Sequence, residues 1–230
     1  MKTIGLIGGM SWESTAAYYA LLNETVHARL GGYHAAECVL HSFDFARIER
    51  LQRENDWPAL TRLMLDAGIR LREAGADFLV ICANTMHIMA DEAERASGIP
   101  VLHIADAAAA AIRADGLRRV GLLGTKFTME KDFYVKRLRE KHGIEALVPD
   151  AADRETVHGV IFGELVHGVV RDSSREKLLG VIERLTGQGA EGVVLGCTEL
   201  PLLLKQQDCP QKLYDTTTLH ALAAVEYALE

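Results

Sequence analysis

An internal repeat constrains the fold of this chain more than any other feature of its sequence. Residues 3–9, TIGLIGG, resemble residues 119–125, RVGLLGT. Residues 77–85, DFLVICANT, resemble residues 191–199, EGVVLGCTE. Each segment is an apolar run that ends in glycine or in small polar residues, which is typical of a buried parallel strand followed by a turn. The sequence therefore predicts that one α/β unit occurs twice.

The spacing of the repeated segments supports this interpretation. Gly8 and Ala83 are 75 residues apart, and Gly124 and Cys197 are 73 residues apart. The segments thus recur in the same order at nearly the same separation. This pattern predicts two lobes related by a pseudo-twofold axis, with Ala83 equivalent to Cys197.

Short β-rich runs alternate with longer helical patterns along the whole chain, which predicts an α/β fold with mostly parallel sheets. The predicted strands are Thr3–Gly8, Glu37–Phe43, Asp77–Cys82, Pro100–Ile104, Arg119–Gly124, Ile144–Val148, Glu191–Gly196 and Lys212–Tyr214. The clearest helices are Trp57–Gly75, Ser173–Gly187 and Thr217–Leu229. We expect residues 1–103 plus 217–230 to form lobe one and residues 104–216 to form lobe two, with the active site in the cleft between them.

Composition excludes several classes of protein. The chain has 230 residues, of which 49% are hydrophobic and 25% charged, with a net charge of −7. This balance indicates a folded globular protein without the basic stripe that nucleic-acid binding requires. No apolar run approaches the ~18 residues of a membrane span, and we expect a cytoplasmic protein. Cys38, Cys82, Cys197 and Cys209 are widely spaced, so we expect free thiols and no metal site.

Four loops follow the repeated strands, at the carboxyl ends where open α/β sheets bind ligands. The first contains Met10 and Ser11, with Ser11 as the expected N-cap of a helix and Ser14 at its third position. Its backbone N–H groups suit a carboxylate or a phosphate, although a plain tight turn explains the loop equally well. The other three loops carry Asn84 and Thr85, Thr125, and Thr198 and Glu199.

Cys197 is the strongest candidate for a catalytic residue. A thiol at a strand end, followed by a hydroxyl and a carboxyl group, can act as a nucleophile or as an acid and base. A lone cysteine is more often a small buried apolar residue, but the duplicated position of Cys197 favours function. We interpret Cys38 and Cys209 as structural. His87 either orients a catalytic group or is a core or surface histidine.

Four motifs resemble those of the aspartate/glutamate racemase family: MKTIGLIGGMSWEST, CANTMH, GLLGTKFTMEKDFY and GVVLGCTEL. The resemblance extends over essentially the whole chain and is nearest to the bacterial branch that includes L-aspartate/glutamate-specific enzymes. It implies amino-acid racemases that work without pyridoxal phosphate or another cofactor, and it implies a homodimer. Members of the family commonly use two cysteines, one from each lobe, to remove and return the α-proton on opposite faces of the substrate.

The resemblance also implies roles for individual residues. Cys197 would be one acid/base. Asn84, Thr85, Thr125 and Thr198 would bind the α-carboxylate and amino groups, and Glu199 and Ala83 would also contact the substrate. Met10, Ser11 and Gln52 would lie around its distal end. Some aspartate racemases have a carboxylate-binding lysine on the long helix of lobe two, where this chain has Val166, flanked by Glu164 and His167. The substrate can therefore also be glutamate or one of a broader range of amino acids. Arg47 can supply the positive charge that the missing lysine would provide.

One departure from the family pattern bears directly on function. The lobe-one base of the family directly precedes the Asn-Thr pair, and this chain has Ala83 there. Cys82 is one residue away, so we expect its side chain to point to the opposite face of the strand, into its own lobe. Three interpretations stay open: a weak, one-sided or inactive racemase, a non-catalytic amino-acid or dicarboxylate-binding protein, and a decarboxylase that uses a single cysteine.

Overall fold

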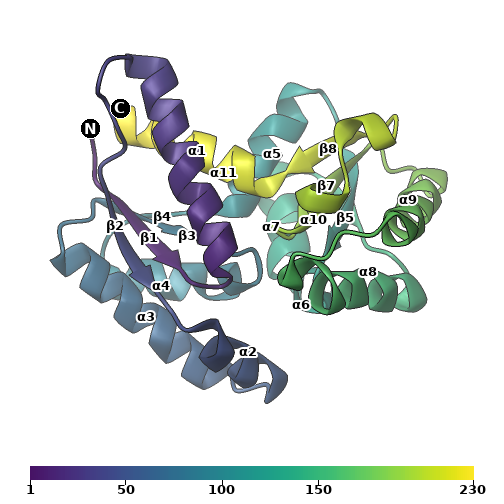
Figure 1. Ribbon diagram of the computed structural model, residues 1–230, viewed down its shortest axis with the longest axis horizontal. Helices are drawn as coiled ribbons and strands as arrows, with labels where there is room; N and C mark the ends of the chain where they lie inside the picture. Colours follow the sequence, from purple (N-terminus) through teal and green to yellow (C-terminus); the bar gives the residue numbers. More distant parts are fainter. The chain divides into compact units, whose positions relative to one another are not determined.

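The computed structural model describes residues 1–230 and divides them into two compact units. Unit 1 comprises Met1–His103 and His220–Glu230, and unit 2 comprises Ile104–Leu219. The chain passes from unit 2 back to unit 1 within its last helix, three residues later than the boundary at 216/217 that the sequence suggested. Each unit is a four-stranded parallel sheet with helices on both faces (Figure 1).

Unit 1 has the strand order β2-β1-β3-β4. Its elements are β1 Ile4–Gly8, α1 Trp12–Leu30, β2 Cys38–Ser42, α2 Phe45–Arg53, α3 Trp57–Glu73, β3 Phe78–Ile81, the 3₁₀ helix η1 Thr85–Met89, α4 Ala90–Ser97 and β4 Val101–Leu102. The later part of α11, Thr216–Leu229, completes it. The two central strands are wholly buried, because helices cover both faces of the sheet.

Unit 2 repeats this topology with the order β6-β5-β7-β8. Its elements are α5 Ile104–Ala114, β5 Arg119–Gly124, α6 Lys126–Glu130, α7 Asp132–His142, β6 Glu145–Leu147, α8 Ala151–Gly163, η2 Leu165–His167, α9 Asp172–Gly187, β7 Gly192–Gly196, α10 Leu200–Leu203, η3 Gln206–Asp208 and β8 Lys212–Asp215. In both units the first strand of the repeat pairs with the third, so β1 and β3 correspond to β5 and β7.

Two apolar clusters in each unit fill the space between the sheet and its helices. In unit 1, one cluster joins the sheet to α2, α3 and α4, and the other joins it to α1 and α11. In unit 2, one cluster joins the sheet to α8, α9 and α10, and the other to α5 and α7. Burial of this apolar surface is the main term that holds each three-layer unit together, at roughly 25 cal/mol per Å².

Local signals in the sequence set the ends of several helices. Asp56 caps α3 by accepting a hydrogen bond from the backbone N–H of Ala59 at 3.0 Å, and Asp150 caps α8 in the same way through Asp153 at 2.9 Å. These caps satisfy backbone donors that a helix N-terminus leaves unpaired. Gly143 ends α7 in the left-handed conformation.

The α/β class, the duplication and the predicted strands are confirmed. The largest difference in length concerns the predicted strand Pro100–Ile104, which is reduced to the two residues of β4. Only Val101 and Leu102 pair with β3, and Ile104 already begins α5. The chain leaves the edge of the sheet there, because it passes from unit 1 into unit 2.

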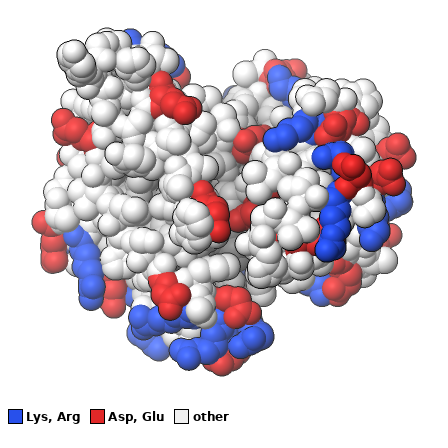
Figure 2. All heavy atoms as spheres, in the orientation of Figure 1, with Lys and Arg blue, Asp and Glu red and all other residues white.

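Positive and negative side chains are interleaved over the face shown in Figure 2. A dense group of basic side chains lies at the lower edge of this view (Figure 2). Helix α2 carries Arg47, Arg50 and Arg53 together with Glu49. None of the helices combines the length and the apolar composition that crossing a membrane requires.

The close approach of β5 and β7 generates a stability prediction. A Cβ atom on Gly124 would lie 2.9 Å from the carbonyl oxygen of Gly196 and 3.1 Å from Thr128 Cβ. We therefore expect Gly124→Ala to lower the free energy of unfolding by about 1–3 kcal/mol, as overpacking does in a core. Urea unfolding followed by circular dichroism measures the change.

Gly159 provides the matched control for that substitution. It lies inside α8, and a Cβ atom there would meet nothing within 4 Å. We expect Gly159→Ala to stabilise the protein by about 0.5–1 kcal/mol through helix propensity. Equal effects of the two substitutions would contradict the steric explanation.

Candidate functional site

The carboxyl ends of β1 and β3 lie next to each other in unit 1. The strands pair in register, with Ile7 opposite Ile81, and the Cys82 N–H donates a hydrogen bond to the Ile7 carbonyl at 2.9 Å. Ser14 Oγ on α1 donates to the carbonyl of Cys82 at 2.9 Å. The loop that follows β1 and the loop that follows β3 are therefore linked directly.

Side-chain hydrogen bonds shape the loop between β1 and α1. Ser11 Oγ accepts from the Ser14 N–H at 3.2 Å, so the predicted N-cap is confirmed. Thr15 Oγ1 accepts from the Gly9 N–H at 2.8 Å and donates to the Ser11 carbonyl at 3.0 Å. Gly9 has a φ of +80°, and a Cβ atom there would lie 2.2 Å from the Phe43 carbonyl oxygen, so only glycine fits the turn.

Other predicted site residues of unit 1 gather around this edge of the sheet. Gln52 on α2 donates from Nε2 to the sulfur of Met86 at 3.4 Å. Met10, Ala83 and Met86 belong to one apolar cluster. The predicted residues are each at most 8% exposed: Met10, Ser11, Gln52, Ala83, Asn84 and Thr85. A buried set of polar groups at strand ends is what a binding site for a small polar molecule requires.

Ala83 and Cys82 belong to opposite faces of the unit 1 sheet. Ala83 packs in the cluster that faces α2, α3 and α4, whereas Cys82 packs with residues of α1 and α11. Cys82 is fully buried, and burial raises the pKa of its thiol far above the ordinary range, with a smaller contribution from Cys38. The prediction that Cys82 turns into its own lobe is confirmed, and its thiol stays protonated.

His87 lies in the first turn of η1 and is buried. Its Nδ1 donates to the Ala83 carbonyl at 2.9 Å, and its ring is 4.7 Å from that of His103 and 5.4 Å from that of His220. Burial, and secondly the neighbouring His220, lower the pKa of His87 to about 3. The ring is therefore neutral, and it fixes the backbone at Ala83.

Unit 2 has an equivalent edge at the ends of β5 and β7. Gly124 pairs with Gly196, so Thr125 and Cys197 follow two adjacent strand ends. Thr125 caps α6, with Oγ1 3.4 Å from the Thr128 N–H and 3.3 Å from Thr128 Oγ1. Ser11 and Thr125 thus cap the helix that follows the first strand of each repeat.

Cys197 belongs to a compact hydrogen-bonded group. Its Sγ donates to Glu199 Oε2 at 3.0 Å, and Thr198 Oγ1 donates to the same oxygen at 2.8 Å. Cys197 and Glu199 are each 8% exposed. The three consecutive residues therefore form one unit in which a carboxylate accepts from both a thiol and a hydroxyl.

Burial raises the pKa of the Cys197 thiol well above its ordinary value, and the Glu199 carboxylate raises it further through its charge and the hydrogen bond. The backbone N–H groups of Thr198 and Glu199 act in the opposite direction. The free protein therefore holds Cys197 as a thiol at neutral pH. A group next to it must take the proton before the sulfur can act as a base.

A third polar group near the β5 end was not recognised in the sequence. The Lys126 backbone N–H donates to His158 Nδ1 on α8 at 3.2 Å, and the Lys126 ammonium forms an ion pair with Glu155. The i,i+3 spacing of Glu155 and His158 was the only available signal for this pair, and the sequence does not indicate which loop α8 approaches. Burial lowers the pKa of His158, and Lys126 adds to this effect.

Two expectations drawn from the family pattern have different outcomes. Val166 lies on the 3₁₀ helix η2, beyond the end of α8, so its placement on the long helix was wrong; α8 ends at Gly163. Its neighbour Glu164 accepts from Ser174 Oγ at 2.7 Å and from Arg171 at 2.9 Å. Arg47 is exposed on α2 and lines a 270 Å³ pocket of unit 1. Its role as the cation that replaces the missing lysine stays a prediction.

The remaining cysteines are unpaired. All four are free thiols in this structure. Cys38 and Cys209 are half-buried, and burial raises the pKa of both. The shared cleft predicted between the lobes stays a prediction.

A sequence profile of the Asp/Glu/Hydantoin racemase family matches residues 7–224. The chain belongs to this family. The match begins within β1 and includes all four strand-end loops.

Solved structures with the same fold agree with this membership. A Yersinia pestis protein that is provisionally described as an Asp/Glu racemase is 50% identical, with a TM-score of 0.94 over 100% of both chains. An aspartate racemase homologue from Pyrococcus horikoshii is 37% identical, with a TM-score of 0.86 over 100% of both chains.

A curated relative is more distant. A glutamate racemase from Synechococcus is 29% identical over 182 residues, which is 78% of this chain and 64% of that protein. The alignment thus spans less than two thirds of that relative's length.

The Cys197–Glu199 contact generates a chemical prediction. Removing the Glu199 charge removes one cause of the raised Cys197 pKa, so Glu199→Gln should shift the thiolate fraction toward lower pH. At a fixed pH near 9 we expect Cys197 to react faster with iodoacetamide in this variant than in the original chain. Mass spectrometry of the Cys197 peptide measures the rate across a pH series.

Glu24→Gln is the matched control, because Glu24 is exposed on α1 in the other unit. It removes the same charge and should leave the pH profile of Cys197 unchanged. A Glu199→Gln profile that coincides with that of the original chain would show that Glu199 does not control the thiol.

Proposed function

We propose that this protein is an amino-acid racemase of the aspartate/glutamate type that works without a cofactor and uses Cys197 as an acid and base. The observation that carries this proposal is the hydrogen-bonded group of Cys197, Thr198 and Glu199 at the end of β7. Family membership supports the reaction class. The duplicated strand-end loops supply hydroxyl, amide and backbone groups suited to an amino acid.

The chemistry begins with proton transfer inside this group. The Cys197 thiol gives its proton to Glu199 along the 3.0 Å hydrogen bond, which leaves a thiolate and a carboxylic acid. The thiolate then takes the α-proton of the substrate, so the sulfur becomes a thiol again and the substrate carries the electron pair as a carbanion. Binding of a charged substrate must supply the free energy for the first transfer, because Cys197 rests as a thiol.

The predicted binding residues have compatible chemistry. Thr125 and Thr198 contribute hydroxyl groups in unit 2, and Ser11, Asn84 and Thr85 contribute donors in unit 1. All but Thr198, which is half-buried, are buried, so hydrogen bonds to a carboxylate are stronger there than in water. Such donors also stabilise the negative charge that develops when the α-proton leaves.

Ala83 makes the proposed reaction one-sided. It occupies the position equivalent to Cys197, and an alanine side chain has no proton to give or take. Cys82 does not replace it, because its side chain packs against α1 and α11. We therefore propose that Cys197 exchanges the α-proton of one enantiomer with solvent, whereas inversion depends on water and is slow.

Isotope exchange and inversion separate these steps. We expect loss of the α-proton signal of one enantiomer of aspartate or glutamate by proton NMR in deuterated water, with little inversion by chiral chromatography. Ala83→Cys should raise the inversion rate about 10²-fold or more, the ordinary contribution of one general acid or base. Cys197→Ala should abolish both exchange and inversion.

The outcomes distinguish the alternative functions. Saturable amino-acid binding by calorimetry without exchange in either the original chain or Ala83→Cys would contradict the racemase proposal and favour a binding protein. Release of carbon dioxide from a substituted malonate in place of exchange would favour the single-cysteine decarboxylase.

Cys82 provides a second, independent test. Because its side chain lies on the opposite face of the sheet from Ala83, we expect Cys82→Ala to leave the exchange rate unchanged within about twofold. The same NMR assay measures it, with circular dichroism to verify folding. A loss of exchange comparable to that in Cys197→Ala would identify Cys82 as a second base and contradict the one-sided mechanism.

A homodimer is also part of the proposal, since the family resemblance implies one. Light scattering of the purified chain measures the oligomeric state directly.

A further inference from the structure

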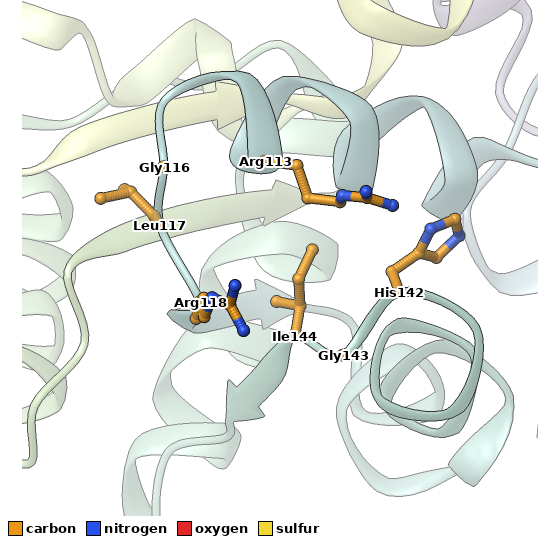
Figure 3. A pocket seen from close by; sticks show the side chains of 7 residues that line it. All are labelled: Arg113, Gly116, Leu117, Arg118, His142, Gly143 and Ile144. Carbon is orange, nitrogen blue, oxygen red and sulfur yellow. The ribbon is translucent and has the colours of Figure 1, made fainter.

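Unit 2 has a pocket at the end of its sheet opposite the one that carries Cys197. Its lining residues precede β5 and β6, whereas Cys197 follows β7, and all strands of the sheet are parallel. The pocket has a volume of 440 Å³ and is lined by Arg113, Leu117, Arg118, His142 and Ile144 together with two glycines. Figure 3 shows the Arg113 side chain directed toward the His142 ring, with Ile144 beneath it.

The two guanidinium groups of this pocket have no carboxylate partner, because the nearby acids bind elsewhere. Glu191 accepts from the backbone N–H groups of Arg118 and Arg119, each at 3.0 Å. Glu145 pairs with the Arg119 side chain at 3.0 Å. Asp115 accepts from the Tyr214 hydroxyl at 2.8 Å. The charges of Arg113 and Arg118 are therefore available to a ligand.

His142 connects the pocket wall to a further group of positive charges. Its Nε2 lies 2.7 Å from Asp106 Oδ1. The same carboxylate accepts two hydrogen bonds from Arg137, at 2.7 and 2.8 Å, and one from Lys141 at 2.6 Å. A single negative charge is thus shared by two permanent cations. Asp106 lies two turns before Arg113 on α5 and is fully occupied by these partners.

The opposing electrostatic effect is smaller than these charges. Helices α5 and α7 both end at the pocket, and each helix C-terminus carries roughly half a negative charge. Arg113 and Arg118 contribute two full positive charges, and the Asp106 group adds one more. The nearby Glu191, Glu145 and Asp115, offset by Arg119 and Lys212, subtract one further charge, so the sum is about one positive charge and the pocket attracts anions.

We propose that this pocket binds an organic phosphate, a small molecule with a phosphate monoester group. One guanidinium fork satisfies both oxygens of a carboxylate, whereas a phosphate monoester has three terminal oxygens and can engage Arg113 and Arg118 together. The volume exceeds that of a bare phosphate ion, and the half-buried Leu117 supplies an apolar contact for the organic part. The inference is independent of the proposed racemase activity.

Calorimetry of the full chain at low ionic strength tests the proposal, with ribose 5-phosphate, inorganic phosphate and succinate as probes. We expect saturable binding of ribose 5-phosphate that is tighter than that of the other two. The double variant Arg113→Gln/Arg118→Gln should weaken it at least about tenfold, as expected when charged hydrogen bonds are lost.

The matched control is Arg53→Gln/Arg95→Gln, which removes two positive charges from exposed helices of unit 1. The affinity of this control variant for ribose 5-phosphate should stay within about twofold of that of the original chain. If both double variants bound ribose 5-phosphate equally weakly, the loss would be explained by net charge alone, and the proposal would be overturned. The proposal would also be overturned if succinate bound as tightly as ribose 5-phosphate, or if ribose 5-phosphate showed no saturable binding. These readouts require no turnover, so failure of the racemase assay leaves them intact.

Discussion

The pairing of two parallel strands that both end in small residues is the constraint on which the site depends. In unit 2, Gly124 and Gly196 lie directly opposite each other, and neither has room for a side chain. Thr125 and Cys197 follow them, so backbone hydrogen bonds of the sheet determine how close the hydroxyl and the thiol lie. The same pairing in unit 1 brings the Gly9 turn beside Ala83. Rigid sheets thus position loops whose own residues are few and polar.

The electrostatics of Cys197 separate its resting state from its proposed reactive state. Burial and the Glu199 carboxylate both favour the thiol, and only backbone N–H groups favour the thiolate. A protonated resting cysteine is protected from oxidation, since the thiolate is the reactive form. The carboxylate that suppresses the thiolate is also the nearest acceptor for its proton, so one residue can serve both purposes.

The equivalent positions Ala83 and Cys197 differ in side-chain chemistry although the two units share one topology. The two units have the same strand order, and the equivalent loops keep capping hydroxyls and small polar residues. Ala83 and Cys197 are the first residues at which the two equivalent loops differ in acid–base chemistry. His87 holds the backbone carbonyl of Ala83 from a buried position, so the geometry of the loop is maintained although its side chain has no acid–base chemistry.

The sequence by itself determined the α/β class, the duplication and the Ser11 cap, because apolar runs, turn glycines and capping residues act over a few neighbouring positions. It also predicted that Cys82 and Ala83 face opposite sides, which follows from the alternation of a strand. Only the tertiary structure decided that Glu199 accepts from Cys197, that His158 reaches Lys126 and that Val166 lies beyond α8. Likewise, Arg113 and Arg118 come from the end of α5 and the loop after it, whereas His142 comes from the end of α7. The His158–Lys126 contact and the pocket depend on packing between distant parts of the chain, which no local pattern encodes. The Cys197–Glu199 contact depends on the backbone turn that follows β7, which the residue types alone do not fix.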